Sequence, residues 1–200
     1  MKKVISLLVL LFISSTVFCQ TFMHGAGVTI LVGSSKGGNV SVSKGFTYFP
    51  RINLLETEAL SVSAGIPLSI GISGSYSGTY SSSGGYYSNP GTIGFMVNAP
   101  FIINLNIGRG STKENTDKFG YFVGAGIGYH HGDFIILATD SYGSDYTATE
   151  SINFVGPAAN AGVRIGVGSV HRNIEIRLSY MKEVNKNKVN LFGIACAFNF

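Results

Sequence analysis

The amino-acid sequence predicts an all-β protein, specifically an eight-stranded antiparallel up-and-down transmembrane β-barrel. Three observations support this fold class. Large apolar residues alternate with small or polar residues along most of the chain, glycine accounts for 27 of 200 residues, and only 12% of the residues are charged. A soluble domain usually carries about 25% charged residues. The low charge therefore disfavours a disordered tail, a coiled coil and a nucleic-acid-binding protein.

The alternation is clearest between residues 60 and 75. All even positions from 60 to 72 are apolar, whereas the odd positions are Ser, Gly or Pro. Successive side chains of a strand point to opposite faces, so the large apolar residues share one face. The same pattern recurs in three further segments, 92–107, 172–182 and 189–200.

The composition of the second face distinguishes a membrane barrel from a soluble sandwich. An exposed face in a soluble sheet usually carries Lys, Glu and Thr, but here it is mostly Gly, Ser, Ala and Asn. Small residues suit a narrow lumen, and the large apolar face then meets lipid. A one-residue slip would turn six large side chains of the 59–76 strand inward, at roughly 1.5–3 kcal/mol each, so the register is well specified.

Eight strands are expected, joined by connections of alternating length. Their spans are 22–33, 40–55, 59–76, 92–107, 119–130, 152–168, 172–182 and 189–200. The connections 77–91 and 131–151 are long and rich in Gly, Ser and Tyr, which is typical of outer loops, whereas periplasmic turns are short. The connection 108–118 is an exception, because it is long for a periplasmic turn. Ten strands would need additional strands within the two long loops, and neither loop alternates well.

Four prolines fall inside the predicted strands, where each removes a ladder hydrogen bond: Pro50, Pro67, Pro100 and Pro157. If the second outer loop is centred near residues 83 and 84, paired residue numbers add to 167 and Pro67 stands opposite Pro100. We expect a shared bulge there. Either the strands bend at the prolines or the predicted spans run past the sheet.

Residues 1–19 are predicted to be a secretory signal peptide, and residues 20–200 the barrel domain. A short basic start precedes a run of ten residues, 4–13, that is apolar except for Ser6 and is too short for a membrane helix of ~20 residues. Cleavage is expected after Cys19. The alternative, lipidation of Cys19, is disfavoured by the bulky Phe18 before it. Cleavage lowers the net charge from +4 to +2 and leaves Cys196 as the only thiol, so no internal disulfide is expected.

The end of the chain, residues 192–200, reads FGIACAFNF and alternates apolar residues, three of them Phe, with Gly, Ala and Asn. Together with the signal peptide and the amphipathic strands, it resembles the small bacterial outer-membrane β-barrel proteins of the OmpX/OmpA-like family. The segment 118–129, KFGYFVGAGIGY, is similar to a glycine-rich strand common in such barrels. The resemblance implies an outer-membrane location, contact with outer-membrane lipid, and a C-terminal signal for the outer-membrane insertion machinery. The residues of that signal are Phe192, Phe198 and Phe200.

Charge on the predicted inward face is sparse and is limited to Arg51, Arg164, Glu175 and Arg177. These residues lie at similar heights above their periplasmic turns, so we expect them to meet at one level of the lumen. Asn98 and Asn160 are among the residues expected to complete the hydrogen bonding. The preferred interpretation is a structural plug, because an eight-stranded lumen is too narrow to conduct. An anion site or a gated pore is the alternative, since three arginines face one glutamate.

The outer loops combine tyrosine with Ser and Gly, as adaptable contact surfaces do. The tyrosines are Tyr80, Tyr86 and Tyr87 in the second loop and Tyr142 and Tyr146 in the third. They are predicted to contact an extracellular glycan or protein, with an interfacial aromatic belt as an equal alternative. The third loop begins near His130 to Asp133 and carries four acids and no base. It matches no compact metal-ligand spacing, and no nucleophile stands two residues after either histidine, so a solvated acidic loop is expected.

The sequence therefore predicts a non-enzymatic, integral outer-membrane protein. Its role would be structural, adhesive or in recognition, through the loops 77–91 and 131–151. No catalytic residue, metal, cofactor or nucleic-acid partner is predicted. The alternatives are a narrow pore for small solutes and an exported soluble barrel that binds an apolar ligand, and a lipid-modifying enzyme comes third.

Overall fold

A computed structural model describes residues 21–35, 40–75, 77–80, 86–89, 93–139, 145–168, 172–184 and 189–200. The predicted signal peptide and its cleavage position lie outside these residues. The strands are β1 (Phe22–Ser34), β2 (Val40–Glu56), β3 (Leu60–Gly65), β4 (Leu68–Ser75), β5 (Ser77–Tyr80), β6 (Tyr86–Asn89), β7 (Ile93–Gly108), β8 (Phe119–Thr139), β9 (Asp145–Gly166), β10 (Asn173–Lys182) and β11 (Asn190–Asn199). Within the described ranges, no helix is long and apolar enough to cross a membrane.

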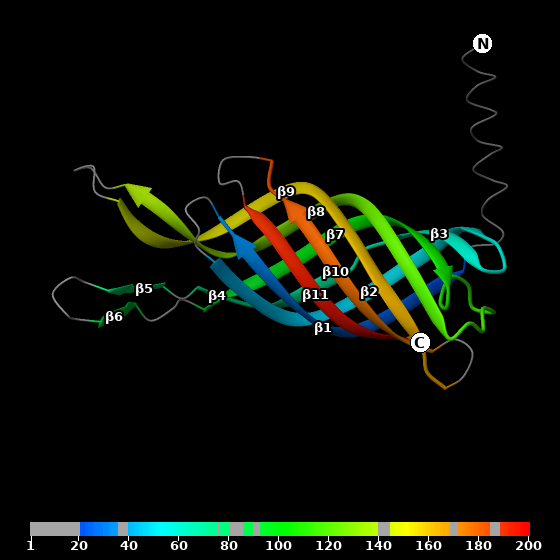
Figure 1. Cartoon of the computed structure of the whole chain (residues 1–200). Coiled ribbons are helices and arrows are strands. Elements are labelled where there is room, and N and C mark those ends of the chain that lie inside the picture. Colours follow the sequence, from blue (N-terminus) through cyan, green and yellow to red (C-terminus); the bar gives the residue numbers. More distant parts are fainter. Residues whose placement is uncertain are drawn as a thin grey trace, which may run out of the picture.

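Nine of the described strands form one antiparallel sheet that closes on itself (Figure 1). The strands β7, β8, β9, β10, β11, β1 and β2 follow one another around the ring, and β3 and β4 both lie between β2 and β7. Because β3 and β4 are two halves of one interrupted strand, the described strands fill eight positions around the barrel. The predicted up-and-down β-barrel is confirmed.

The interruption between β3 and β4 lies at Pro67. Residue numbers paired across β3–β7 and across β4–β7 add to 167, so the predicted register is confirmed and Pro67 faces Pro100. The expected shared bulge is not what forms. Instead, the amide of Leu68 donates to the carbonyl of Ile66 at 2.8 Å and closes a tight turn. This turn takes the place of the ladder hydrogen bonds that two opposed prolines cannot make. On the other side, β7 continues through Pro100 without a break. The other two prolines lie within continuous strands, Pro50 in β2 and Pro157 in β9.

The two long outer loops contain more strand than the sequence predicts. Within 77–91, β5 pairs with β6 as a separate two-stranded hairpin. Within 131–151, β8 and β9 stay paired as far as Thr139 and Asp145. Both hairpins extend beyond the barrel on the side away from the C-terminus, which we call the loop end, and the opposite side is the termini end (Figure 1). A hairpin outside a membrane needs no apolar face, so its sequence lacks the alternation that marks the barrel strands.

The barrel is apolar outside, and polar residues outnumber apolar ones among its buried side chains. Along β7, exposed apolar residues such as Phe95 (59% exposed) and Ile103 (49%) alternate with buried residues such as Asn104 and Asn106. Exposed apolar and buried polar residues alternate in the same way along β4, where Ile70 is exposed and Ser69 and Ser73 are buried. This arrangement is the opposite of a soluble barrel with an apolar core, and it is stable only where apolar solvent surrounds the outer wall.

Exposed aromatic residues lie at both rims of the outer wall, as in membrane barrels. Near the termini end they include Phe22, Phe119, Tyr121, Phe198 and Phe200, and near the loop end Phe95, Tyr129, Tyr180 and Phe192. On β8 the eight-residue separation of Tyr121 and Tyr129 corresponds to ~27 Å along the strand and to ~20 Å along the axis of a barrel tilted by ~40°. This height is close to the apolar band of ~25 Å found in membrane barrels.

A basic substitution on the lipid-facing wall should therefore lower the free energy of unfolding by an amount that depends on how deep in the membrane the residue lies. We expect Ile103→Arg, near the middle of β7, to lower the free energy of unfolding by about 2–4 kcal/mol. The matched variant Ile93→Arg, at the loop end of the same strand and face, should cost about 0–1 kcal/mol. Urea unfolding of barrels refolded into lipid vesicles measures both values. Equal costs at the two depths would contradict a lipid-facing wall.

Candidate functional site

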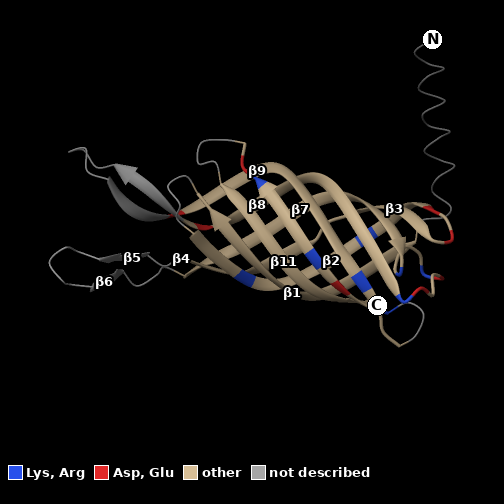
Figure 2. Cartoon of the chain, viewed as in Figure 1, with Lys and Arg blue, Asp and Glu red and all other residues tan. Residues whose placement is uncertain are grey.

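Four of the predicted lumen residues meet near the termini end of the barrel: Arg51 from β2, Arg164 from β9, and Glu175 and Arg177 from β10. Nε of Arg164 donates to Oε2 of Glu175 at 2.7 Å, and Nη2 of Arg177 donates to the other carboxylate oxygen. The cluster is buried, and Arg164 has no exposed surface. Figure 2 shows basic positions with an acidic one among them in the half of the barrel nearer the C-terminus. One carboxylate thus serves two arginines directly.

Arg51 joins the cluster through two oxygen atoms that it shares with Arg164. The side-chain oxygen of Asn106 accepts from Nη1 of each arginine at 3.0 Å. The carbonyl of Gly110 accepts from Nη2 of Arg51 at 2.5 Å and from Nη1 of Arg164 at 3.3 Å. Asn106 was not among the predicted site residues, although its inward position on an alternating strand was the available signal. Neutral oxygens therefore bridge two like charges that have one carboxylate nearby.

Two inward phenylalanines stack against the guanidinium groups. Arg177 lies 3.7 Å from the ring centroid of Phe49, and Arg164 lies 4.4 Å from that of Phe122. Both rings are buried in the lumen, whereas the residues next to them in β2 and β8 face outward. Cation–π contacts strengthen when they are removed from water. The rings fill space and hold the arginines in place, and sequence reasoning did not identify them.

The connection 109–118, which is unusually long for a periplasmic turn, folds into the barrel as a plug. Its residues Arg109, Ser111 and Thr112 are buried. The carbonyl of Ser111 accepts from Nδ2 of Asn53 and from Oγ of Ser61, both at 2.7 Å. Together with the two arginines on the carbonyl of Gly110, these bonds tie the plug (residues 109–112) to the inner wall at the termini end.

Neither Asn98 nor Asn160 is hydrogen-bonded to the charged cluster among the described residues. The hydrogen bonds expected of them come from Asn106 and Gly110. Asn98 Oδ1 is 3.3 Å from Nδ1 of His130, farther toward the loop end. Asn160 lines a cavity together with Arg177. Neither polar atom of its side-chain amide has a hydrogen-bond partner among the described residues.

The loop-end half of the lumen is filled mainly by apolar side chains. Its buried cluster comprises Leu31, Met96, Ile102, Phe134, Ile152, Phe154, Ala158, Met181, Val189 and Leu191. The expectation that His130 to Asp133 begin a solvated loop is wrong, because these residues belong to β8 and pair with β9. His130 and Asp133 are buried in the lumen, and Oγ of Ser151 donates to Oδ1 of Asp133 at 2.5 Å. Within the described residues, the lumen is therefore packed on both sides of the cavity.

The remaining predicted residues lie on the outside or beyond the described side chains. Phe192, Phe198 and Phe200 occupy exposed positions on the outer wall or at its edge, and their role in membrane insertion stays a prediction. The side chains predicted to make outer contacts all lie outside the described set: Tyr80, Tyr86, Tyr87, Tyr142 and Tyr146. In the part of the chain that is described, no three His, Cys, Asp or Glu side chains gather closely enough to hold a metal ion.

No protein-family model matches the chain, and no curated protein matches it. Solved structures do match over nearly all of its length. Ail, the attachment invasion locus protein of Yersinia pestis, in complex with the heparin analogue sucrose octasulfate, aligns with a TM-score of 0.52 at 13% identity, covering 90% of this chain and 98% of Ail. Neisserial surface protein A aligns with a TM-score of 0.50 at 14% identity, covering 90% of this chain and 97% of that protein. The chain therefore has the fold of the small bacterial outer-membrane β-barrel proteins, and its apolar outer wall fits the membrane in which barrels of this fold lie.

Proposed function

We propose that the barrel is a non-enzymatic outer-membrane anchor that displays two β-hairpins for recognition at the cell surface. The observation that carries this proposal is the continuation of paired backbone beyond the barrel at the loop end. The β5–β6 hairpin and the distal parts of β8 and β9 lie there, while the described connections at the termini end stay close to the barrel (Figure 1). Paired strands hold loop tips in a defined orientation, which lowers the entropy lost when a partner binds.

The packed lumen disfavours the alternative of a pore. At the termini end the plug is held by four hydrogen bonds to the carbonyls of Gly110 and Ser111. Toward the loop end, rings such as Phe134 and Phe154 pack around His130 with centroids 5.3–5.6 Å from its ring. A solute would have to displace both sets of contacts, so the barrel is better suited to anchoring than to transport.

The chemistry of the hairpins favours a neutral glycan or a basic protein surface as the partner. Apart from Asp133, which is buried in the lumen, the segment 131–151 contains three acids and no Lys or Arg, and tyrosine occurs in both hairpin segments. Tyrosine provides rigid contact area with a hydrogen-bonding tip, and it suits sugar rings and protein surfaces alike. Ail was crystallised with a polyanionic heparin analogue. In this chain, like-charge repulsion at the acidic segment opposes binding of such a polyanion there.

Replacement of the hairpin tips tests the proposal. In one variant, residues 77–89 are replaced by a short Gly-Ser linker, and in a second variant residues 140–144 are replaced in the same way. Refolded wild-type barrel is applied to an array of neutral glycans, with heparin as the charged comparison, and to surfaces coated with basic proteins. We expect wild-type binding to at least one neutral or basic probe, and at least a tenfold loss in one variant.

Two controls accompany this experiment. Heat-modifiable migration in detergent shows that each variant still forms the barrel, so a loss of binding is not a loss of fold. Recording in planar bilayers should show no steady ohmic conductance from the wild type. Binding that is unchanged in both variants, or steady conductance of the intact barrel, would contradict the assignment as a recognition anchor.

A further inference from the structure

The charged cluster of the lumen carries more positive than negative charge. Arg164 and Arg177 donate to the single carboxylate of Glu175. Among the described residues, Arg51 bonds only neutral oxygens and the sulfur of Met23. The next acid, Glu56, is bonded to Asn53 and Thr21 at the termini end and is partly exposed. Buried charges are normally balanced by opposite charge, because an uncompensated charge is poorly solvated away from water. The cluster therefore favours an additional negative charge close by.

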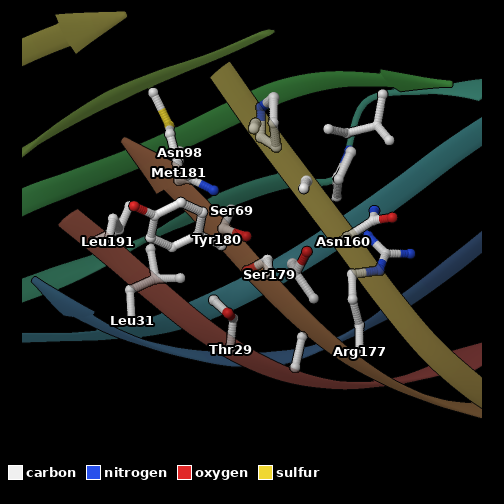
Figure 3. Close-up of a pocket in the computed structure, with 17 residues that line it drawn as sticks. Thr29, Leu31, Ser69, Asn98, Asn160, Arg177, Ser179, Tyr180, Met181 and Leu191 are labelled. Carbon is white, nitrogen blue, oxygen red and sulfur yellow. The ribbon is translucent and has the colours of Figure 1, made fainter. Parts of the chain in front are cut away.

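A cavity lies next to this cluster, between it and the apolar packing of the loop-end half (Figure 3). Its volume is about 30 Å³, enough for one or two groups of the size of water. Its lining includes the polar side chains of Thr29, Thr47, Ser69, Asn98, Asn160, Arg177 and Ser179. Figure 3 shows the guanidinium of Arg177 reaching toward Asn160 from the neighbouring strand. A cavity inside a membrane barrel is thus lined by hydrogen-bond donors beside a surplus of positive charge.

Two of the lining residues have donors that the protein does not satisfy. The side-chain amide of Asn160 and Nε of Arg177 are buried, and neither has a hydrogen-bond partner among the described residues. Asn160 is 6% exposed and Arg177 7% exposed. Buried polar groups are nearly always hydrogen-bonded, so the unsatisfied donors at this cavity indicate a bound group that accepts hydrogen bonds. The unsatisfied Oδ1 of Asn160 calls for a donor such as a water beside that group.

We propose that the cavity is a binding site for a small inorganic anion of the size of chloride, held by the amide of Asn160 and the guanidinium of Arg177. Such an ion accepts from both donors and offsets the surplus charge of the arginine cluster. A volume of about 30 Å³ suits a monatomic anion in the place of a water. The site would stabilise the closed barrel, and it does not depend on what the hairpins bind.

Anomalous diffraction from the wild-type barrel crystallised in sodium bromide locates the ion directly. We expect a bromide peak within hydrogen-bonding distance of Asn160 Nδ2 and Arg177. A cavity that holds only water under these conditions, without an anomalous peak, would overturn the proposal. This measurement needs no variant, so its outcome does not depend on whether a substituted barrel folds.

Thermal unfolding in detergent tests the energetic role. At equal ionic strength, replacing sodium gluconate by sodium chloride should raise the unfolding midpoint of the wild type by several degrees and in a saturable manner. Asn160→Asp supplies a fixed negative charge in place of the ion. We expect this variant to be as stable in gluconate as the wild type is in chloride, and to have lost the response to chloride.

Matched variants separate anion binding from general effects of charge. Asn160→Ala removes the donor without adding charge, so it should lose the chloride response and show no gain in gluconate. Asn153→Asp adds the same charge on the exposed side of β9 and should keep the full response. A chloride response that persists in both Asn160 variants, or is missing from the wild type, would contradict binding at this cavity.

Discussion

Replacing Glu175 with glutamine should lower the free energy of unfolding by about 3–5 kcal/mol, because it leaves buried arginines without their counter-charge. Both carboxylate oxygens are used, one by Arg164 and the other by Arg177. The side-chain amide of Asn199 also donates to Glu175 at 3.3 Å. Glutamine keeps the volume but presents one acceptor and one donor, so it cannot reproduce the two charge-assisted bonds. Urea unfolding in lipid vesicles, followed by heat-modifiable migration, measures the loss.

A comparison with Arg177→Met makes this prediction specific. Methionine keeps an unbranched stem to pack against Phe49 and removes one of the three positive charges. Glu175 then remains paired with Arg164 at 2.7 Å, so no buried charge is left unbalanced by the change. We expect Arg177→Met to be much less destabilising than Glu175→Gln. If Arg177→Met were equally or more harmful, the single carboxylate would not be the group on which the cluster depends.

The barrel wall could be predicted from the sequence because its signal is local. The wall has lipid on one side and a narrow lumen on the other, so large apolar residues alternate with small or polar ones along each strand. This alternation shows which side chains of the strand face the lipid. Pro67 and Pro100 even indicated the pairing register, which the structure confirms. Arg164, Glu175 and Arg177 could be assigned to the inward face by the same alternation.

The contents of the lumen were harder to predict, because some of the contacts there are made by backbone atoms, which are the same in every residue type. The acceptors that join Arg51 to Arg164 include the backbone carbonyl of Gly110, which any residue type would carry. The two hairpins beyond the barrel were missed because their sequences lack the alternation that marks the barrel strands. The length of the 108–118 connection and its two glycines were the available signals for the plug. They do not indicate by themselves that the segment folds inward.

Gly110→Ala tests the plug, and we expect it to be strongly destabilising for two separate reasons. Gly110 has a φ of 72°, a conformation that costs an L-residue about 1–2 kcal/mol. A Cβ at this position would also lie 2.9 Å from Cδ of Arg164 and 3.1 Å from Nδ2 of Asn173. Arg164 cannot move aside without straining its bonds to Glu175 and Asn106. The contact should therefore add to the backbone cost and loosen the charged cluster.

Gly168→Ala is the matched control for the free-energy cost of the backbone conformation alone. Gly168 has a similar φ of 65°, but a Cβ there would meet no atom of the described residues within 4 Å. The control should therefore show only the cost of the backbone conformation, about 1–2 kcal/mol. The difference between the two variants in urea unfolding then measures how tightly the plug is held against the arginines. Equal losses would mean that residues 109–112 are free to leave the lumen, and the termini end would not be closed as the hydrogen bonds to Gly110 and Ser111 imply.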